Sequence, residues 1–193
     1  MSALVRYLTH PQVQVDPAVP VPLWGLSAVG RGRVLAVAAS GWLSGTTQVI
    51  ASAEKKALET AEPIAEALGV QVEVRDLMHE NDRSATGFLP PEEFETVANE
   101  FFAHPDVSIR GWECARDAQE RIVREVETVL GRSHEGHVLF VGHGAVGTLL
   151  YCRYAKIWIN RVHDQPPGGG HYFTMKKSGR EMLHSWRRME NAP

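Results

Sequence analysis

The stretch HVLFVGHGAVGTLLYC, residues 137–152, joins a short apolar run to a helical pattern through a histidine. The run VLFVG predicts a strand buried on both faces, because apolar residues follow one another without polar interruption. His143 then opens a predicted helix, whose first amide groups have no partner inside the helix and point beyond the sheet. Ligands of open α/β sheets bind beyond the carboxyl ends of parallel strands, so His143 is a candidate site residue.

Another histidine ends the first predicted strand. The run ALVRYLT, residues 3–9, is followed by His10 and by Pro11, which lacks the amide donor that the strand would use next. If the two strands are neighbours in the sheet, the two imidazoles meet over a site already suited to an anion. A single histidine at a strand end is usually structural or merely exposed, so the interpretation depends on the pair.

The rest of the chain alternates strand and helix patterns. Strands are expected at 47–52, 70–74 and 171–175, and helices at 27–39, 53–69, 92–103 and 113–131. This alternation is typical of an α/β domain with a largely parallel sheet. We expect one domain, residues 1–193, in which the polar, turn-rich segment at about 78–112 is an inserted substrate or lid region.

The composition excludes several classes of protein. The length of 193 residues suffices for one domain with a full core, and 44% hydrophobic and 22% charged residues are ordinary for a globular protein. A net charge of −3 gives no electrostatic case for nucleic acid, and no apolar run reaches the roughly 18 residues of a membrane span. Because the N-terminus lacks an export signal, we expect a cytoplasmic protein without a membrane partner.

Three smaller features are expected to be structural. Cys114 and Cys152 lack CxxC spacing and are expected to be small buried side chains in a reducing compartment. The three glycines at 168–170 predict a mobile loop, because no helix with phosphate-loop spacing follows them. Basic residues near the C-terminus are interleaved with Glu181 and Glu190, which indicates a solvated tail. They are Lys176, Lys177, Arg180, Arg187 and Arg188.

Five sequence pieces together resemble the histidine phosphatase superfamily, also called phosphoglycerate mutase-like. The family pattern is a strand ending in Arg-His-Gly, then PLTxxG, SxLxRAxxTA, an acidic residue after a third strand, and a strand followed by GHG. The pieces that match in order are THP at 9–11, WGLSAVG at 24–30, ASAEKKALETA at 51–61, LMHEND at 77–82 and LFVGHGAV at 139–146. The resemblance spans about residues 3–175. It implies a three-layer α/β/α sandwich with a mostly parallel central sheet.

The resemblance also implies an activity, that of a metal-independent phosphatase that hydrolyses a phosphomonoester through a phosphohistidine. His10 matches the nucleophile, His143 the group that stabilises charge on the phosphoryl oxygens, and Glu80 the carboxylic acid that protonates the leaving group. Asp82, Glu92 and Glu93 remain rival acids. The implied substrate is a small phosphorylated molecule, with no metal and no cofactor, and a homodimer is compatible with the sequence.

Two departures from the family pattern concern the phosphate pocket. Thr9 stands where the family has the arginine of Arg-His-Gly, and Lys56 replaces the arginine of SxLxRA, so two bidentate guanidinium groups are missing. We expect Thr9, Lys56, Arg83 and Gly144 to line the phosphate site, with Arg83 supplying the missing charge. An alternative alignment places Arg6-Tyr7 on Arg-His, but the strand continues beyond Tyr7.

Other functional readings stay open. The departures at Thr9 and Lys56 are compatible with a degenerate member that binds a phosphorylated ligand or partner without turnover. Metal binding by His79, His163 and His171 is a weaker alternative, because no HExxH or comparable pair occurs. Within the inserted region, Arg110 and Trp112 are candidate ligand contacts, or else pack on their own helix.

Overall fold

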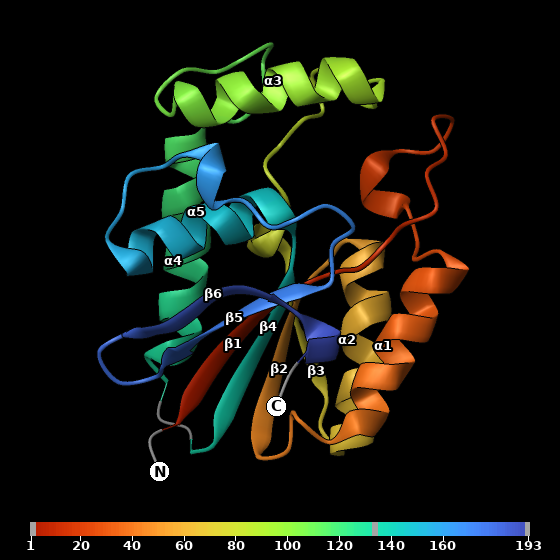
Figure 1. The fold of residues 1–193 in the computed structure, drawn as a ribbon, viewed down its shortest axis with the longest axis vertical. Helices are drawn as coiled ribbons and strands as arrows, with labels where there is room; N and C mark the ends of the chain where they lie inside the picture. Colours follow the sequence, from red (N-terminus) through yellow and green to blue (C-terminus); the bar gives the residue numbers. More distant parts are fainter. Residues whose placement is uncertain (1–2, 133–134, 192–193) are drawn as a thin grey trace.

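A six-stranded mixed sheet forms the centre of the computed structural model, which describes residues 3–132 and 135–191. The strands are β1 (Leu4–Thr9), β2 (Thr46–Ser52), β3 (Val72–Arg75), β4 (His137–Gly142), β5 (His171–Lys176) and β6 (Met182–Arg188). Their spatial order is β3-β2-β4-β1-β5-β6 (Figure 1). The first four strands run parallel, whereas β5 pairs antiparallel with both β1 and β6.

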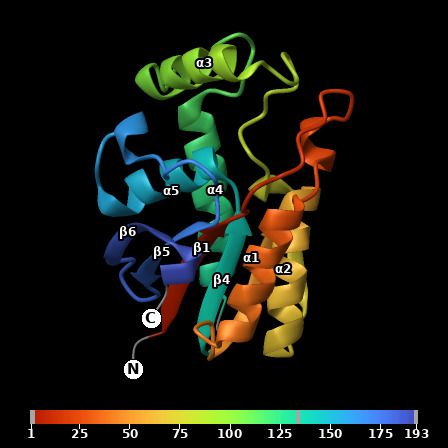
Figure 2. The same ribbon diagram turned by 45° about the vertical axis from the view of Figure 1, so that its right-hand side comes forward.

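Five α-helices surround this sheet. They are α1 (Ala28–Ser40), α2 (Lys55–Leu68), α3 (Pro91–Ala103), α4 (Ala115–Leu130) and α5 (Gly144–Ala155). Helices α1 and α2 cover one face, and α4 and α5 cover the other (Figures 1 and 2). Short 3₁₀ helices lie at Val21–Leu23, Asp76–Met78, Arg161–His163 and Met189–Asn191. The predicted three-layer α/β/α sandwich with a mostly parallel sheet is confirmed.

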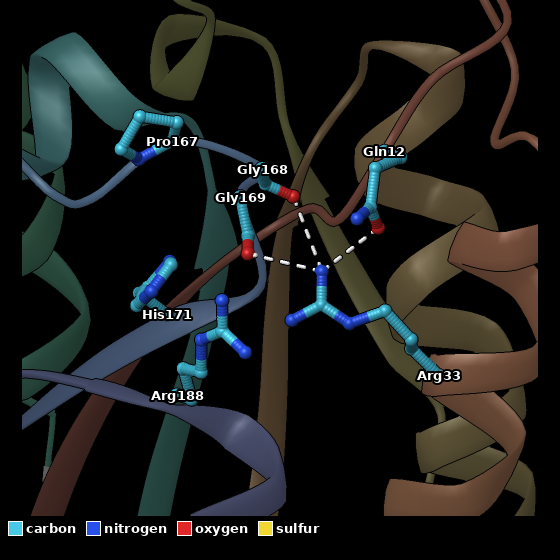
Figure 3. A pocket seen from close by; sticks show the side chains of 7 residues that line it. All are labelled: Gln12, Arg33, Pro167, Gly168, Gly169, His171 and Arg188. Atoms are coloured by element: carbon cyan, nitrogen blue, oxygen red, sulfur yellow. Dashed lines mark hydrogen bonds between the residues drawn. The ribbon is translucent and has the colours of Figure 1, made fainter.

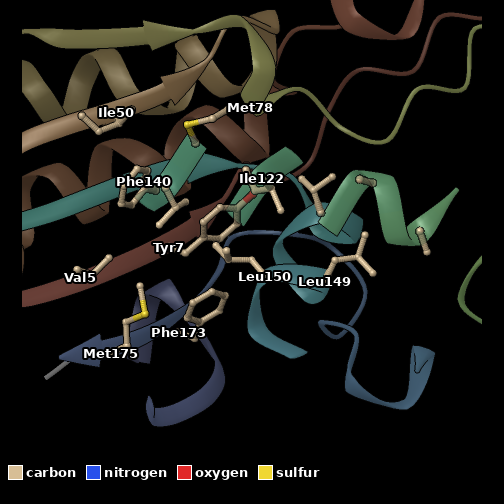
Figure 4. Close-up of a cluster of buried hydrophobic side chains, with 14 of the residues drawn as sticks. Val5, Tyr7, Ile50, Met78, Ile122, Phe140, Leu149, Leu150, Phe173 and Met175 are labelled. Carbon is tan, nitrogen blue, oxygen red and sulfur yellow. The ribbon is translucent and has the colours of Figure 1, made fainter. Parts of the chain in front are cut away.

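Apolar residues on both faces of the central strands require a layer of helices on each side. In β4, Val138 and Phe140 belong to one buried cluster, whereas Leu139 and Val141 belong to the other. Successive strand residues point to opposite faces, so the uninterrupted apolar run of β4 is buried on both. Figure 4 shows the cluster on the α4 and α5 side, to which Tyr7 also belongs.

Local sequence signals set several helix ends. The Ser27 hydroxyl accepts a hydrogen bond from the N–H of Gly30 (3.1 Å), which makes it the cap of α1. Gly69 ends α2 with a left-handed φ of 67°, a conformation that glycine adopts without steric cost. The inserted segment carries α3 across the edge of the sheet at which the parallel strands end (Figure 1). This places it over the expected site.

The C-terminal segment differs from its prediction. The sequence predicts a solvated tail here, but the segment forms β6, which contains Arg187 and Arg188. In this strand Met182 and Trp186 pack against the buried cluster. The strand was missed because its only apolar residues are Met182, Leu183 and Trp186, which form neither an apolar run nor a regular alternation. Cys152 is buried as expected, but Cys114 is only partly buried. Within residues 3–132 and 135–191, no helix is both long and apolar enough to span a bilayer.

Pro63 gives a test of the local stability of α2. It lies inside the helix and has no N–H to donate to the carbonyl four residues earlier. We expect Pro63→Ala to raise the free energy of unfolding by about 1 kcal/mol or more, because alanine restores that hydrogen bond. Urea unfolding followed by circular dichroism measures the change. Glu62→Ala, at an exposed neighbour, should change little, and a less stable Pro63→Ala variant would contradict the expectation.

Candidate active site

The pairing of β1 with β4 brings the two strand-end histidines together. Thr9 pairs with Gly142 at the ends of these parallel strands, and the N–H of His10 donates to the Gly142 carbonyl (3.0 Å). His10 and His143 are the next residues along each strand. Their ring centroids are 5.3 Å apart and their planes are inclined by 68°. The condition set by the sequence, that the two strands are neighbours, is therefore met.

The ring of His10 is held in one tautomer. Its Nδ1 lies 2.8 Å from the carbonyl oxygen of Pro11, which can only accept, so Nδ1 carries the proton and Nε2 the free lone pair. Nε2 has no hydrogen-bond partner among the described residues, and it is not sealed from solvent. Burial, with the neighbouring His143 and Lys56, lowers the pKa of His10 to about 3, against the opposing effects of Pro11 and Glu80. His10 is therefore neutral at neutral pH.

His143 is fully buried at the start of α5. Its Nε2 lies 2.8 Å from the Ser52 hydroxyl and 3.5 Å from Oε1 of Glu54, while its Nδ1 has no partner among the described residues. Burial lowers the pKa of His143, although the carboxylates of Glu54 and Glu80 act in the opposite direction. The Tyr7 hydroxyl holds its main chain, accepting from the His143 N–H (3.1 Å) and donating to its carbonyl (3.2 Å).

Glu54 is a buried site residue that sequence reasoning missed. It forms an ion pair with buried Lys56, and its Oε1 accepts from the N–H of Glu80 (2.8 Å). Burial raises the pKa of Glu54, but His143 and Lys56 lower it by more, to about 2. The charge of Lys56 is thus balanced inside the site. The signal was available, because Glu54 occupies the leucine position of the SxLxRA motif.

The Glu80 carboxylate lies against the first turn of α5. It accepts hydrogen bonds from the N–H groups of Ala145 (3.3 Å) and Val146 (3.0 Å), and Nη2 of Arg83 is 3.7 Å away. Burial alone would raise the pKa of Glu80, but Arg83, His143 and the Val146 amide outweigh burial and lower it. Glu80 therefore caps α5 in addition to adjoining the histidines.

Arg121, from α4, holds the segment that carries Glu80. Its Nη1 donates to the carbonyls of Leu77 (2.7 Å) and His79 (3.0 Å), and its Nη2 to that of Glu80 (3.3 Å). The guanidinium also pairs with Glu113 at 2.7 Å. Nothing in the sequence distinguishes Arg121 from the other charged residues of its helix, because its partners come from a distant part of the chain.

Thr9 is linked to Gln165 rather than left free. Its buried hydroxyl donates to Oε1 of Gln165 (2.6 Å) and accepts from the N–H of His171 (3.0 Å). On the other side of Gln165, a Cβ added at Gly144 would stand 2.5 Å from Nε2, so a larger residue at 144 would displace the Gln165 amide. Gln165 thus lies between the ends of β1 and β4, and the sequence analysis did not single it out.

Several sequence candidates pack in the inserted segment or the core, although Arg83 also reaches Glu80. Arg83 lies over the rings of Phe94 (5.1 Å) and Trp112 (5.4 Å), and Trp112 is itself buried in the core. Arg110 pairs with Glu93 at the surface of the inserted segment. The alternative nucleophile Tyr7 is buried and stacks on Phe173 (5.4 Å), and the side chain of Arg6 lies over Trp42. The rival acid Asp82 accepts from the N–H of Ser84, and Glu92 lies in the first turn of α3.

The histidines considered for metal binding do not form a cluster. In the part of the chain that the structure describes, no group of three or more His, Cys, Asp or Glu side chains could hold a metal ion. His79 lies beside Glu80, the ring of His163 packs near Tyr151, and His171 begins β5. Their separation follows from the strand order, which sequence spacing does not reveal.

A sequence model of the histidine phosphatase superfamily (branch 1) matches residues 22–182. The chain belongs to this superfamily. The matched range begins after His10 and includes Glu54, Glu80 and His143. A search of curated protein sequences gives no match.

Solved structures of the same fold include several phosphatases. A mycobacterial glucosyl-3-phosphoglycerate phosphatase in complex with VO3 has a TM-score of 0.79 and 18% identity, over 97% of this chain and 100% of its own. YhfR from Bacillus stearothermophilus has a TM-score of 0.79 and 18% identity, over 95% of each chain. A phosphoserine phosphatase mutant from Entamoeba histolytica, in complex with phosphoserine, has a TM-score of 0.77 and 15% identity. The match covers 97% of this chain and 98% of the phosphoserine phosphatase chain.

The contact of Tyr7 with His143 can be tested by removing one oxygen. Tyr7→Phe leaves the buried N–H and C=O of His143 without their side-chain partner, so we expect a loss of about 1–3 kcal/mol in the free energy of unfolding. Urea unfolding measures it. Tyr172→Phe is the matched control, because Tyr172 is also buried but its hydroxyl bonds to no described residue. Equal losses in the two variants would contradict a specific role for the Tyr7 hydroxyl.

Proposed function

We propose that this protein is a metal-independent phosphatase that hydrolyses a small phosphomonoester through a phosphohistidine at His10. The observation that carries the proposal is the fixed tautomer of His10, whose Nε2 is neutral, unpartnered and open to solvent beside His143. A nucleophilic nitrogen requires this combination. The phosphatases among the structural neighbours, which include a phosphoserine phosphatase, support the same class of substrate.

The reaction has two steps in this proposal. In the first, Nε2 of His10 forms a bond to phosphorus, the bond from phosphorus to the ester oxygen breaks, and Glu80 protonates the departing alkoxide. In the second, Glu80 removes a proton from water, the water oxygen bonds to phosphorus, and the bond from phosphorus to Nε2 breaks. Inorganic phosphate leaves and both residues return to their starting state.

Glu80 must hold a proton at the start of this reaction, although Arg83, His143 and the Val146 amide lower its pKa. A phosphate dianion bound nearby raises the pKa of a carboxylate, because the two negative charges repel each other. Arg83 also contributes, since a phosphate that attracts its guanidinium draws positive charge away from Glu80. Substrate binding thus favours the acid form of Glu80 that the first step consumes.

The proposed phosphate contacts are His143, Lys56, Arg83 and the main chain at Gly144. Thr9 has an indirect role, because its hydroxyl orients the Gln165 amide and leaves Nε2 of Gln165 as a donor near Gly144. In this proposal the neutral amide of Gln165 supplies one of the hydrogen bonds to phosphate that the missing arginine would make. An amide donor bonds phosphate more weakly than a guanidinium does, so a modest affinity is expected.

A second candidate function is favoured by Glu54. Its carboxylate neutralises Lys56 and lies 3.5 Å from His143, so two groups expected to face phosphate are already engaged by an anion. This arrangement fits a degenerate member that binds a phosphorylated ligand or partner without turnover.

The free cysteines Cys114 and Cys152 are compatible with the proposed cytoplasmic setting of either function.

Hydrolysis of a generic aryl phosphate in the presence of a chelator tests the proposed catalysis. We expect His10→Ala to reduce kcat/KM at least about 10³-fold, because the nucleophile is removed. His137→Ala is the control, since His137 lies at the opposite end of β4 from His143. Activity that survives in His10→Ala would refute the nucleophile, and an inactive wild type that still binds phosphate would favour the non-catalytic alternative.

The role of Glu54 can be tested by removing its charge. We expect Glu54→Gln to bind inorganic phosphate at least about tenfold more tightly than the wild type, because a repelling carboxylate is lost and Lys56 is released. Isothermal titration calorimetry measures the affinity without requiring turnover. Glu62→Gln, at an exposed position on the same helix, should bind like the wild type. Weaker binding by Glu54→Gln would show that Glu54 supports the site instead of opposing phosphate.

A further inference from the structure

A second polar cavity of about 210 Å³ lies beside the candidate active site (Figure 3). The residues that line it include Gln12, Arg33, Gly168, Gly169, His171 and Arg188. The side chain of His10 is not among them, and the N–H of Gly170 donates to the His10 carbonyl (3.0 Å) between the two regions. The volume suits one phosphate or carboxylate group with part of a small molecule.

Arg33 fixes one wall of this cavity. Its Nη1 donates to the carbonyls of Gly168 (3.1 Å) and Gly169 (3.1 Å) and to Oε1 of Gln12 (2.8 Å), as Figure 3 shows. Its charge is paired with Glu190. Gly168 and Gly169 adopt φ values of 100° and 61°, which glycine alone adopts readily. The glycine segment is thus held in place by Arg33, whose own donors are already used.

His171 provides an unsatisfied buried group in the wall. It is only 2% exposed, and neither of its ring nitrogens has a hydrogen-bond partner in the described part of the chain. Burial, with Arg33 and Arg188, lowers the pKa of His171, while Glu190 and the Gly169 carbonyl act in the opposite direction. Both ring nitrogens are shielded from the cavity by the atoms around them, so the His171 ring lies in the cavity wall and senses an occupant without bonding to it.

Arg188 and Gln12 supply the donors that remain free. Arg188 is exposed and no carboxylate of the described residues lies within 4 Å of it, whereas Glu190 is already paired with Arg33. Gln12 uses Oε1 to accept from Arg33, which leaves its Nε2 next to Gly168 without a partner. Among the described residues, the cavity therefore has one positive charge with no carboxylate within 4 Å and one free amide donor, and the His171 imidazole lies in its wall.

We propose that this cavity is a second anion site, which binds a phosphate or carboxylate group of a small molecule. Arg188 supplies the charge, Gln12 supplies a hydrogen bond, and the His171 ring forms part of the wall. Both groups present negatively charged oxygens, on a planar carboxylate or a tetrahedral phosphate, and a guanidinium binds either one. The site is separate from His10 and does not depend on the proposed reaction there.

Histidine side-chain NMR of the full-length protein tests this site, with inorganic phosphate and citrate as probes. We expect the His171 signals to shift saturably with at least one probe. Arg188→Gln should weaken that response at least about tenfold, because the uncompensated charge is lost. Arg187→Gln is the matched control, since successive residues of β6 point to opposite faces and Arg187 does not line the cavity. It should respond as the wild type does.

The outcomes separate this site from the one at His10. The His10 and His143 signals report binding at the candidate active site, so their response to phosphate should be the same in Arg188→Gln and in the wild type. A larger His171 response to phosphate than to citrate would identify a phosphate site, and the reverse a carboxylate site. His171 signals that respond to neither probe, or respond equally in Arg188→Gln, would overturn the proposal.

Discussion

The parallel pairing of β1 with β4 is the contact on which the candidate site depends. Because Thr9 stands opposite Gly142, the next residue of each strand is a histidine at the same edge of the sheet. A slip of one residue in this register would turn one strand's side chains to the opposite face. The apolar residues of β4 fill both buried clusters, so such a slip would expose much of the core. Packing of the core thus fixes the distance between the two imidazoles.

The electrostatics of the site come from paired charges rather than from an excess of cations. Lys56 is paired with Glu54, and Arg83 lies near Glu80, so each of these two basic side chains already has a carboxylate beside it. Breaking a buried ion pair is costly unless a new partner replaces the lost one. A phosphate group can do this for Lys56 and Arg83, but it must compete with the carboxylates. In the proposed phosphatase, this competition acts together with the loss of two arginines to limit the affinity for phosphate.

The segment from Gln165 to His171 connects the two polar regions of the molecule. Gln165 accepts a hydrogen bond from Thr9, the residue before His10. Gly168 and Gly169 line the cavity that also contains Arg33 and Arg188. The main chain of this segment approaches His10 so closely that a Cβ at Gly169 would stand 2.3 Å from the His10 carbonyl oxygen. Glycine is required there because any larger residue would displace the backbone that carries His10. Gly169, which looks like part of a simple loop in the sequence, therefore has a packing function.

The sequence by itself determined the layered α/β fold and both strand-end histidines. The apolar runs of β1 and β4 must be buried on both faces, and a histidine directly after each run must lie at the edge of the sheet. Tertiary structure alone decided which residues surround those histidines. Glu54, Arg121 and Gln165 reach the site from the start of α2, from α4 and from the loop before β5. Arg121 and Gln165 look like ordinary polar residues in their own segments, and only the departure from the SxLxRA motif marks Glu54. Local patterns report periodicity along the chain, whereas hydrogen bonds and charge pairs between distant segments depend on strand order and helix packing.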